Sequence, residues 1–277
     1  MISDYVGLGA AGPHAYLVGE AAARNVLDAT RAARQFSRLR LDRRTVVWGH
    51  SQGGHGAIWA GGIGPRYAPE LDILGVAALA PATDLDQLAT GVKNTTFGRI
   101  VSAYLADSWA AYYPQLDMNR LVDRRYRRTV SRIGQRCFGG RDALAAAAIT
   151  SQLFGPSFPP PPCRGRSPTC YGPTAPMSRC GRRCWSPRAT PTHSCSRPCS
   201  ASGWPPAAPP ASSSTFAAIL GLEHLSLVTA DSPLTPALVA WAQARLAGNP
   251  ATPHAPPAEP PPDSTAEPLL HRAWIQV

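Results

Sequence analysis

The sequence predicts an α/β fold in which a parallel sheet carries an inserted group of helices. Two short runs rich in apolar residues, 45–48 and 73–79, predict buried strands. A Gly-rich turn at 49–54 and a helix at 55–63 separate them. Strand, helix and strand in that order form a parallel unit with a crossover helix. Residues 85–155 then predict helices alone, which we interpret as a helical lid on the sheet.

The other elements follow from the spacing of apolar residues. A helix is expected at 13–36, where apolar side chains recur at helical intervals before the first strand. The helix after the Gly-rich turn is expected to end at Gly64-Pro65, because both residues disfavour a helix interior. A turn at 221–225 and an amphipathic helix at 236–246 come last. The helices expected in the insertion span 94–113, 118–130 and 142–154.

Most of the net charge of +10 comes from one segment, residues 156–216, which holds seven Arg and no Asp or Glu. The same segment holds 15 of the 30 Pro and six of the seven Cys. Without it the chain has 20 basic and 17 acidic residues, so the overall charge does not indicate a nucleic-acid partner. No run of about eighteen apolar residues and no amino-terminal signal pattern occur, so we expect neither a transmembrane span nor a signal peptide in this chain.

These shifts in composition divide the chain into five parts. The first part of the α/β core, with the Gly-rich turn, occupies 1–84, and the helical lid occupies 85–155. Residues 156–218 form an irregular segment rich in Pro, Arg and Cys, in which no periodicity predicts structure and which we expect to be a disordered surface loop without function. A carboxy-terminal core segment at 219–248 precedes a tail at 249–277, which we expect to be disordered because Pro, Ala and Glu dominate it.

The Gly-rich turn contains Gly-His-Ser-Gln-Gly at 49–53, the G-x-S-x-G pattern of a nucleophile elbow. Glycines on both sides of Ser51 are expected to remove Cβ clashes, so that the serine can occupy a strained turn at the carboxyl end of the sheet. The helix that follows would point its free N–H groups at the same place, and the main-chain amide of Gln52 would stabilise an oxyanion. The sequence therefore predicts a nucleophilic serine, with a purely structural turn as the alternative.

A serine of this kind needs a general base, and His224 is our candidate. In hydrolases with this elbow the chain order is serine, acid, histidine. His224 lies on a turn just before the last expected helix, which fits that order. Of the other histidines, His14 precedes the serine, and His50 and His55 belong to the elbow and its helix, where packing roles are expected. Three more lie in the irregular segment and the tail.

Several blocks of the sequence form one pattern when they are taken together. They are Asp4-Tyr5-x-Gly-Leu-Gly, the helix start at Pro13–Glu20, Trp48-Gly-His-Ser-Gln-Gly-Gly-His55, Tyr67-Ala-Pro-Glu-Leu-Asp72, Ala80-Pro-Ala-Thr-Asp84 and Glu223-His-Leu-Ser-Leu227. This pattern resembles the secretory lipase family, which comprises α/β-hydrolases of fungal and actinobacterial type. The resemblance covers residues 1 to about 154 and 220–248.

The resemblance implies an α/β-hydrolase fold with a helical lid and the hydrolysis of carboxylic esters, triacylglycerols included. Ser51 would be the nucleophile and His224 the base. The family also implies secretion, a small acyl ester or lipid as substrate, and contact of the lid with a lipid interface. It implies no cofactor, no metal, no nucleic acid and no stable protein partner.

Two features depart from the family pattern. Only 44 residues precede Thr45, whereas a full hydrolase sheet has several strands there, with the loop that carries the second oxyanion donor. We therefore expect an incomplete sheet. In addition, no Asp or Glu lies between Asp142 and Glu223, the interval in which the family has its triad acid. Asp84 is our fallback acid because it follows the second strand, although an Asp there also suits a helix N-cap.

The composition of the irregular segment suggests a cause for the missing acid. GC-rich codons for residues 182–204, shifted by one base, can encode a buried strand followed by a loop that bears Asp. The same shift applied to residues 211–216 gives another strand. Our hypothesis is that residues from about 156 to about 218 are translated out of frame, through two compensating insertions or deletions. Resequencing that returns the same frame would contradict a sequencing error as the cause.

The irregular segment also allows three other interpretations. Cys180, Cys184, Cys195 and Cys199, with His193 between the pairs, could bind zinc, although the spacing differs from that of common sites. Disulfides would need an oxidising compartment, and an arginine-rich arm could bind nucleic acid.

For the whole chain, we expect a carboxylic ester hydrolase that is impaired by the missing acid. The first alternative is a catalytically dead fragment or pseudoenzyme of the same fold. The second is peptidase or acyltransferase chemistry at the same serine, which a panel of esters and amides would distinguish.

Overall fold

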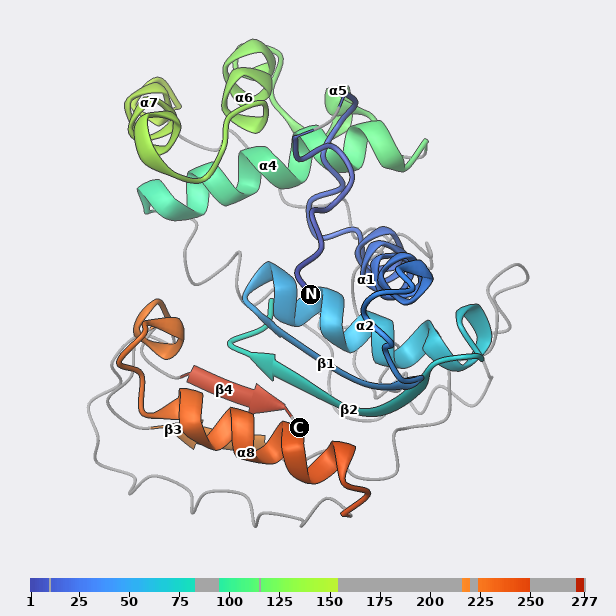
Figure 1. The fold of residues 1–277 in the computed structure, drawn as a ribbon. Helices are drawn as coiled ribbons and strands as arrows, with labels where there is room; N and C mark the ends of the chain where they lie inside the picture. The colour runs from blue at the N-terminus through green and yellow to red at the C-terminus, as the bar shows by residue number, and fades with distance from the viewer. Residues whose placement is uncertain are drawn as a thin grey trace, which may run out of the picture.

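The structure is a computed structural model that describes residues 1–9, 11–82, 95–114, 116–153, 216–219, 224–249 and 273–276. Within these ranges a small sheet lies between helices, and four further helices stand together at one end of the molecule (Figure 1). The α/β class expected from the sequence is confirmed. Asp84 lies in residues 83–94, which are outside the described residues. Most of the irregular segment is also outside them.

The centre of the sheet is the strand–helix–strand unit that the sequence predicts. Strand β1 (Arg44–His50) and strand β2 (Asp72–Leu79) are parallel, with Arg44 opposite Asp72 and His50 opposite Leu79. Helix α2 (Gln52–Tyr67) makes the crossover between them. The carboxyl ends of both strands therefore meet at one edge, where the Gly-rich turn leaves β1.

The predicted parallel pair is confirmed, but the sheet is not parallel throughout. Strand β4 (Ala273–Gln276) pairs antiparallel with β2, and β3 (Phe216–Ile219) pairs antiparallel with β4, in the order β1-β2-β4-β3. Both strands fall in regions for which we expected no order, the end of the irregular segment and the tail. Short runs with β-favouring residues, such as Ala-Trp-Ile-Gln, were hidden by the Pro-rich composition before them.

Helices cover both faces of the parallel pair (Figure 1). Helix α1 (Gly19–Gln35) packs on α2, and α2 packs on the strands so closely that a Cβ at Gly61 would meet Val76. Helix α8 (Leu234–Leu246) lies on the other face, where Trp241 occupies the space beside Gly75. Since neighbouring positions of a strand point to opposite faces, the contacts of Gly75 and Val76 place the sheet between α2 and α8.

Helix α2 passes through Pro65 instead of ending before it. The backbone N–H of Ala68 still donates to the carbonyl of Gly64 at 2.8 Å, and the helix ends at Tyr67. Part of the disturbance by a proline is a clash with the Cβ of the residue before it, and Gly64 has none. The same glycine lets Ile73 of β2 pack against the helix, because a Cβ there would lie 2.3 Å from the Ile73 side chain.

The helices between residues 96 and 150 form a unit with its own core, which we call the cap. It consists of α4 (Thr96–Tyr112), α5 (Met118–Leu121), α6 (Arg127–Gly134) and α7 (Gly140–Thr150). The expected single helix at 118–130 is wrong, because Val122 is extended and the Asp123 carboxylate accepts from the N–H of Arg125 at 2.9 Å, forming a turn. The buried side chains of the cap core include Ile100, Tyr104, Val122, Val130, Ile133, Ile149 and Leu153.

The cap is attached to the segment just before α1. The Tyr112 hydroxyl donates to the carbonyl of Pro13 at 3.1 Å, and the Trp109 indole N–H donates to the carbonyl of Tyr16 at 3.3 Å. The ring of Tyr16 also packs edge-on against Tyr104, with centroids 5.5 Å apart. Residues 13–16 therefore attach the cap to the segment before α1, and we call them the strap.

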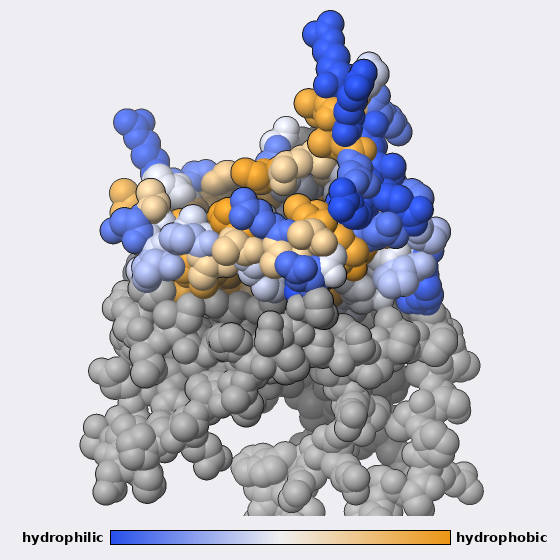
Figure 2. All heavy atoms as spheres, turned by 60° about the horizontal axis from the view of Figure 1, so that its bottom comes forward, coloured by the Kyte–Doolittle hydropathy of each residue, from blue (hydrophilic) through white to orange (hydrophobic). Residues whose placement is uncertain are grey.

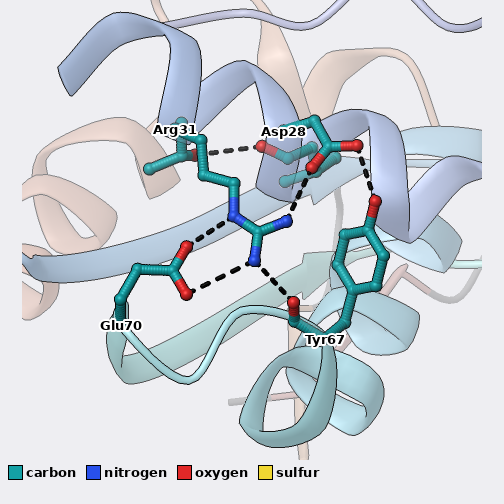
Figure 3. Close-up of polar contacts among 6 residues, drawn as sticks. Asp28, Arg31, Tyr67 and Glu70 are labelled. Carbon is teal, nitrogen blue, oxygen red and sulfur yellow. Dashed lines mark hydrogen bonds and ion pairs between the residues drawn. The ribbon is translucent and has the colours of Figure 1, made fainter. Parts of the chain in front are cut away.

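An ion-pair cluster fixes α1 to the connection between α2 and β2 (Figure 3). Arg31 donates to both carboxylate oxygens of Glu70 and, at 2.6 Å, to the main-chain oxygen of Tyr67. Arg31 also pairs with Asp28 at 2.9 Å, and Asp28 accepts from the Tyr67 hydroxyl at 2.7 Å. Tyr67 and Glu70 of the Tyr67–Asp72 block therefore hold α1 against the connection between α2 and β2.

Helix α8 is rich in hydrophobic residues, yet Leu234 is the only residue of this described helix that is buried. Val239 is 40% exposed, and Val228 in the preceding 3-10 helix (η2, Ser226–Val228) is 48% exposed. Figure 2 shows, on the face that carries α8, hydrophobic residues in orange beside strongly hydrophilic ones in blue.

Among the described helices, none combines the length and the apolar character that a membrane span requires.

The Arg31 cluster leads to a stability prediction for Glu70→Gln. Hydrogen bonding to Arg31 lowers the pKa of Glu70, so its stabilising contribution exists above the usual glutamate pKa of 4.5 and is lost as the pH falls through the lowered value. We expect a modest decrease in melting temperature at pH 7, because the pair is partly exposed and screened, and a smaller decrease as the pH falls toward 3.

The matched control for Glu70→Gln is Glu20→Gln, which removes the same charge from a pair with Arg24 inside one helix. We expect a smaller decrease for the control, since that pair joins no separate elements. Equal thermal shifts for both variants, measured by circular dichroism at both pH values, would contradict the docking role.

Candidate active site

Ser51 occupies a strained backbone conformation between β1 and α2. Its φ is 55° and its ψ is −116°, a region that costs a residue with a Cβ about 1–3 kcal/mol. Two main-chain bonds hold it there. The Ser51 N–H donates to the carbonyl of Leu79 at 2.9 Å, and the Ser51 carbonyl accepts from the N–H of His55 at 3.0 Å. The serine is thereby fixed to the ends of both parallel strands and to the first turn of α2.

The glycines around Ser51 do not contribute as we expected. A Cβ at Gly49 would lie 2.2 Å from the carbonyl oxygen of Gly53, so Gly49 is needed for close approach of the strand to the helix. A Cβ at Gly53 would meet nothing within 4 Å. The second close approach is made by Gly54, whose Cβ would lie 3.1 Å from the carbonyl oxygen of Gly49. The expectation of a clash at Gly53 is therefore wrong, and the close packing needs Gly49 and Gly54.

His224 lies directly against Ser51, although 173 residues separate them along the chain. Its Nε2 is 3.0 Å from the Ser51 Oγ, and both side chains are partly buried. When the imidazole carries its proton on Nδ1, the serine hydroxyl donates to Nε2, which is the arrangement of a nucleophile and its general base. The structure thus brings together the two residues that the sequence singled out.

The environment of His224 favours its neutral form. Burial lowers the pKa of His224, and the neighbouring His50 lowers it further. The two rings pack with centroids 4.6 Å apart, at an angle of 46°. A neutral imidazole can accept a proton, so this shift keeps His224 in the form that a general base requires at a lower pH than an exposed histidine.

A carboxylate partner of His224 is absent from the described part of the chain. Among the residues in those ranges, no Asp or Glu makes a hydrogen bond or ion pair with the His224 ring. Asp84, our fallback acid, lies outside the described residues, as do Cys180, Cys184, His193 and the other side chains of the suggested zinc site.

Gln52 begins α2 next to the serine, so its backbone N–H is among the free donors of the helix start. Its side-chain Nε2 lies 2.9 Å from Nε2 of His14 in the strap, and Nδ1 of His14 lies 3.1 Å from the carbonyl oxygen of Val6. A carbonyl can only accept, so His14 donates from Nδ1 and accepts at Nε2 from the Gln52 amide.

Sequence reasoning gave His14 no role in the site. Its link to Gln52 depends on how residues 6–16 fold back over the start of α2, and no local pattern indicates this. His55 behaves as expected for a core residue: it is 1% exposed, and its ring lies 6.2 Å from that of Trp59. His254 and His271 lie outside the described residues.

A serine in a strained turn between a parallel strand and a helix, facing a histidine from a late segment, is the arrangement found in α/β-hydrolases. The sequence model of the secretory lipase family matches residues 1–151. The chain belongs to the secretory lipase family.

The curated relatives are lipases of fungi and bacteria. Lipase 2 of Candida albicans is 33% identical over 111 residues, which cover 38% of this chain and 24% of the relative. A protein of Mycobacterium tuberculosis named "Probable inactive lipase" is 42% identical over 83 residues, or 29% of this chain and 19% of the relative. The chain thus matches less than a quarter of the length of these relatives.

The solved structures that the fold matches include lipase A of Candida antarctica in its closed state. The match has a TM-score of 0.39 and 19% sequence identity, and it covers 49% of this chain and 31% of that one.

The glycine contacts predict opposite results for two substitutions in the elbow. Gly49→Ala places a methyl group against the Gly53 carbonyl, and overpacking of this kind costs about 1–3 kcal/mol. Gly53→Ala places the methyl group in open space within a helix, where alanine is favoured over glycine by up to ~1 kcal/mol. Thermal unfolding should show Gly49→Ala less stable than the unmodified chain and Gly53→Ala at least as stable. The reverse order would contradict the described packing of the elbow.

Proposed function

We propose that the chain hydrolyses carboxylic esters, acylglycerols included, through an acyl-enzyme on Ser51. The observation that carries the proposal is the 3.0 Å contact between Ser51 Oγ and His224 Nε2, at a serine whose backbone is held in a strained conformation. Membership of a lipase family supports the ester substrate class. Named relatives such as Lipase 2 of Candida albicans support acyl esters of lipids within that class.

In the first half-reaction, Ser51 Oγ attacks the carbonyl carbon of the ester while its proton passes to Nε2 of His224. The carbonyl oxygen becomes an oxyanion, which accepts a hydrogen bond from the main-chain N–H of Gln52. The ester C–O bond then breaks, and His224 gives the proton to the departing alkoxide, which leaves as the alcohol. A water molecule repeats the sequence on the acyl group, so that the acid leaves and Ser51 regains its proton.

We further propose that this activity is slow. An acid normally orients the base and stabilises its charged form, and its removal from a triad costs on the order of 10⁴ in rate. The interval between Asp142 and Glu223 contains no carboxylate, and none among the described residues bonds to His224. The same observations favour the second candidate, a catalytically dead member of the fold. The mycobacterial relative named "Probable inactive lipase" adds to that candidate.

A fluorophosphonate probe distinguishes the two candidates, because it reacts only with an activated serine. We expect labelling of the purified chain, loss of labelling in Ser51→Ala, and a labelling rate roughly 10²–10⁴ lower in His224→Gln. The lowered pKa of His224 predicts that the labelling rate falls at acid pH with a midpoint below 6.5. No labelling of a folded chain would favour the dead candidate, and labelling that survives in Ser51→Ala would exclude Ser51 as the nucleophile.

We propose that the cap acts as a lid that contacts a lipid interface, and that the protein is secreted, as the family name implies. The cap touches the strap, and the strap reaches the elbow through His14. In the cap, Arg124, Arg128 and Arg132 are exposed, and Phe138 is 58% exposed. Exposed basic and apolar side chains in one helical unit suit contact with an interface that carries negative charge.

Vesicle sedimentation tests the contact with lipid. Each arginine near an anionic surface contributes about 1 kcal/mol, so a cap variant with Arg124→Gln, Arg128→Gln and Arg132→Gln should bind phosphatidylglycerol vesicles at least ~10-fold more weakly. The control carries Arg38→Gln, Arg40→Gln and Arg66→Gln, which remove the same charge from exposed positions outside the cap. Equal binding by both variants would contradict a role for the cap, whatever the esterase activity.

A further inference from the structure

His50 makes a contact that the two-residue site does not use. It is the last residue of β1 and immediately precedes Ser51. Its Nε2 lies 2.7 Å from the main-chain carbonyl oxygen of His224. The two imidazole rings also pack against each other, with centroids 4.6 Å apart. His224 is therefore held at two points by two neighbouring residues, through its side chain by Ser51 and through its backbone by His50.

The contact with the carbonyl oxygen determines which ring nitrogen of His50 carries a proton. A carbonyl oxygen only accepts, so His50 donates from Nε2 and carries its proton there. In the neutral ring Nδ1 is then without a proton, and His50 is the opposite tautomer from a His224 that accepts from Ser51 at Nε2. The two histidines thus have separate tasks, because only His224 presents a free Nε2 to the serine.

Hydrogen-bonded strand pairing holds the backbone at His50 in place. His50 pairs with Leu79 across the parallel strands, and the next N–H along the chain, that of Ser51, donates to the Leu79 carbonyl.

We propose that His50 is a positioning residue, which holds the backbone of His224 so that its Nε2 stays opposite the Ser51 Oγ. The proposal rests on the function proposed above for Ser51 and His224. A single bond between Nε2 and Oγ leaves the imidazole free to swing about that contact. The second bond, from the same short stretch of β1, removes this freedom, and a misplacement of about 1 Å can cost 10²-fold in rate.

Three substitutions separate the hydrogen bond from the ring contact. His50→Phe keeps an aromatic ring and loses the donor, His50→Gln keeps an N–H donor at a similar distance from the backbone and loses the ring, and His50→Ala loses both. We expect His50→Phe and His50→Ala to lower the rate of fluorophosphonate labelling and kcat by roughly 10- to 100-fold, with KM nearly unchanged. His50→Gln should recover most of the rate.

The matched control is Gly53→Ala, a substitution in the same turn into open space, and melting curves report whether each variant is folded. A folded His50→Phe variant with the rate of the unmodified chain would overturn the proposal. A His50→Gln variant as slow as His50→Phe would overturn the hydrogen bond as its basis.

Imidazole NMR keeps the proposal testable if the unmodified chain proves unreactive. Two-dimensional ¹H–¹⁵N spectra that correlate ring protons with both nitrogens report which nitrogen carries the proton. We expect His50 to be protonated on Nε2, with a proton protected from exchange, and the His224 signals to change in His50→Phe. A His50 protonated on Nδ1, or His224 signals unaffected by His50→Phe, would refute the contact itself. An inactive chain with the expected signals would instead count against the proposed hydrolase activity alone.

Discussion

The geometry of the site depends on one backbone hydrogen bond, from the N–H of Ser51 to the carbonyl of Leu79. This bond crosses between the ends of two parallel strands at the point where β1 turns into α2. It holds Ser51 at a positive φ that a residue with a Cβ would otherwise avoid. Because Gly49 and Gly54 allow strand and helix to approach each other there, the strain is compensated by packing on both sides. Everything that faces the serine, including His224, is positioned relative to this junction.

Local sequence was sufficient for the parts of the fold that short-range rules determine. The strands at 44–50 and 72–79 and the helix between them follow from apolar runs and Gly-rich turns, and so does the elbow. The pairing of Ser51 with His224 came from chain order in a known arrangement, not from any local signal. The break between α5 and α6 was missed because a single Asp123 carboxylate, hydrogen-bonded to the next turn, outweighs a helical spacing of apolar residues.

Contacts between distant segments could not be predicted in the same way. The His14–Gln52 bond and the His50–His224 bond each depend on how two separate segments meet. No local sequence pattern around a histidine indicates such a distant partner. The antiparallel strands β3 and β4 are short, and they follow regions whose composition suggests disorder. The Tyr67–Asp72 block illustrates the converse case: its residues are distinctive in the sequence, yet Tyr67 and Glu70 act by docking α1, at the opposite end of α2 from Ser51.

The strap contacts both the cap and the elbow, and so links one to the other. Helix α4 holds the carbonyls of Pro13 and Tyr16, while His14, between them, holds the side chain of Gln52. A rigid-body displacement of the cap must therefore either break the bonds from Tyr112 and Trp109 or pull His14 away from α2. Each such bond contributes about 0.5–1.5 kcal/mol, and the packing of Tyr16 on Tyr104 adds to the attachment of the cap. The strap therefore couples the position of the cap to the side chain of Gln52, the residue next to Ser51.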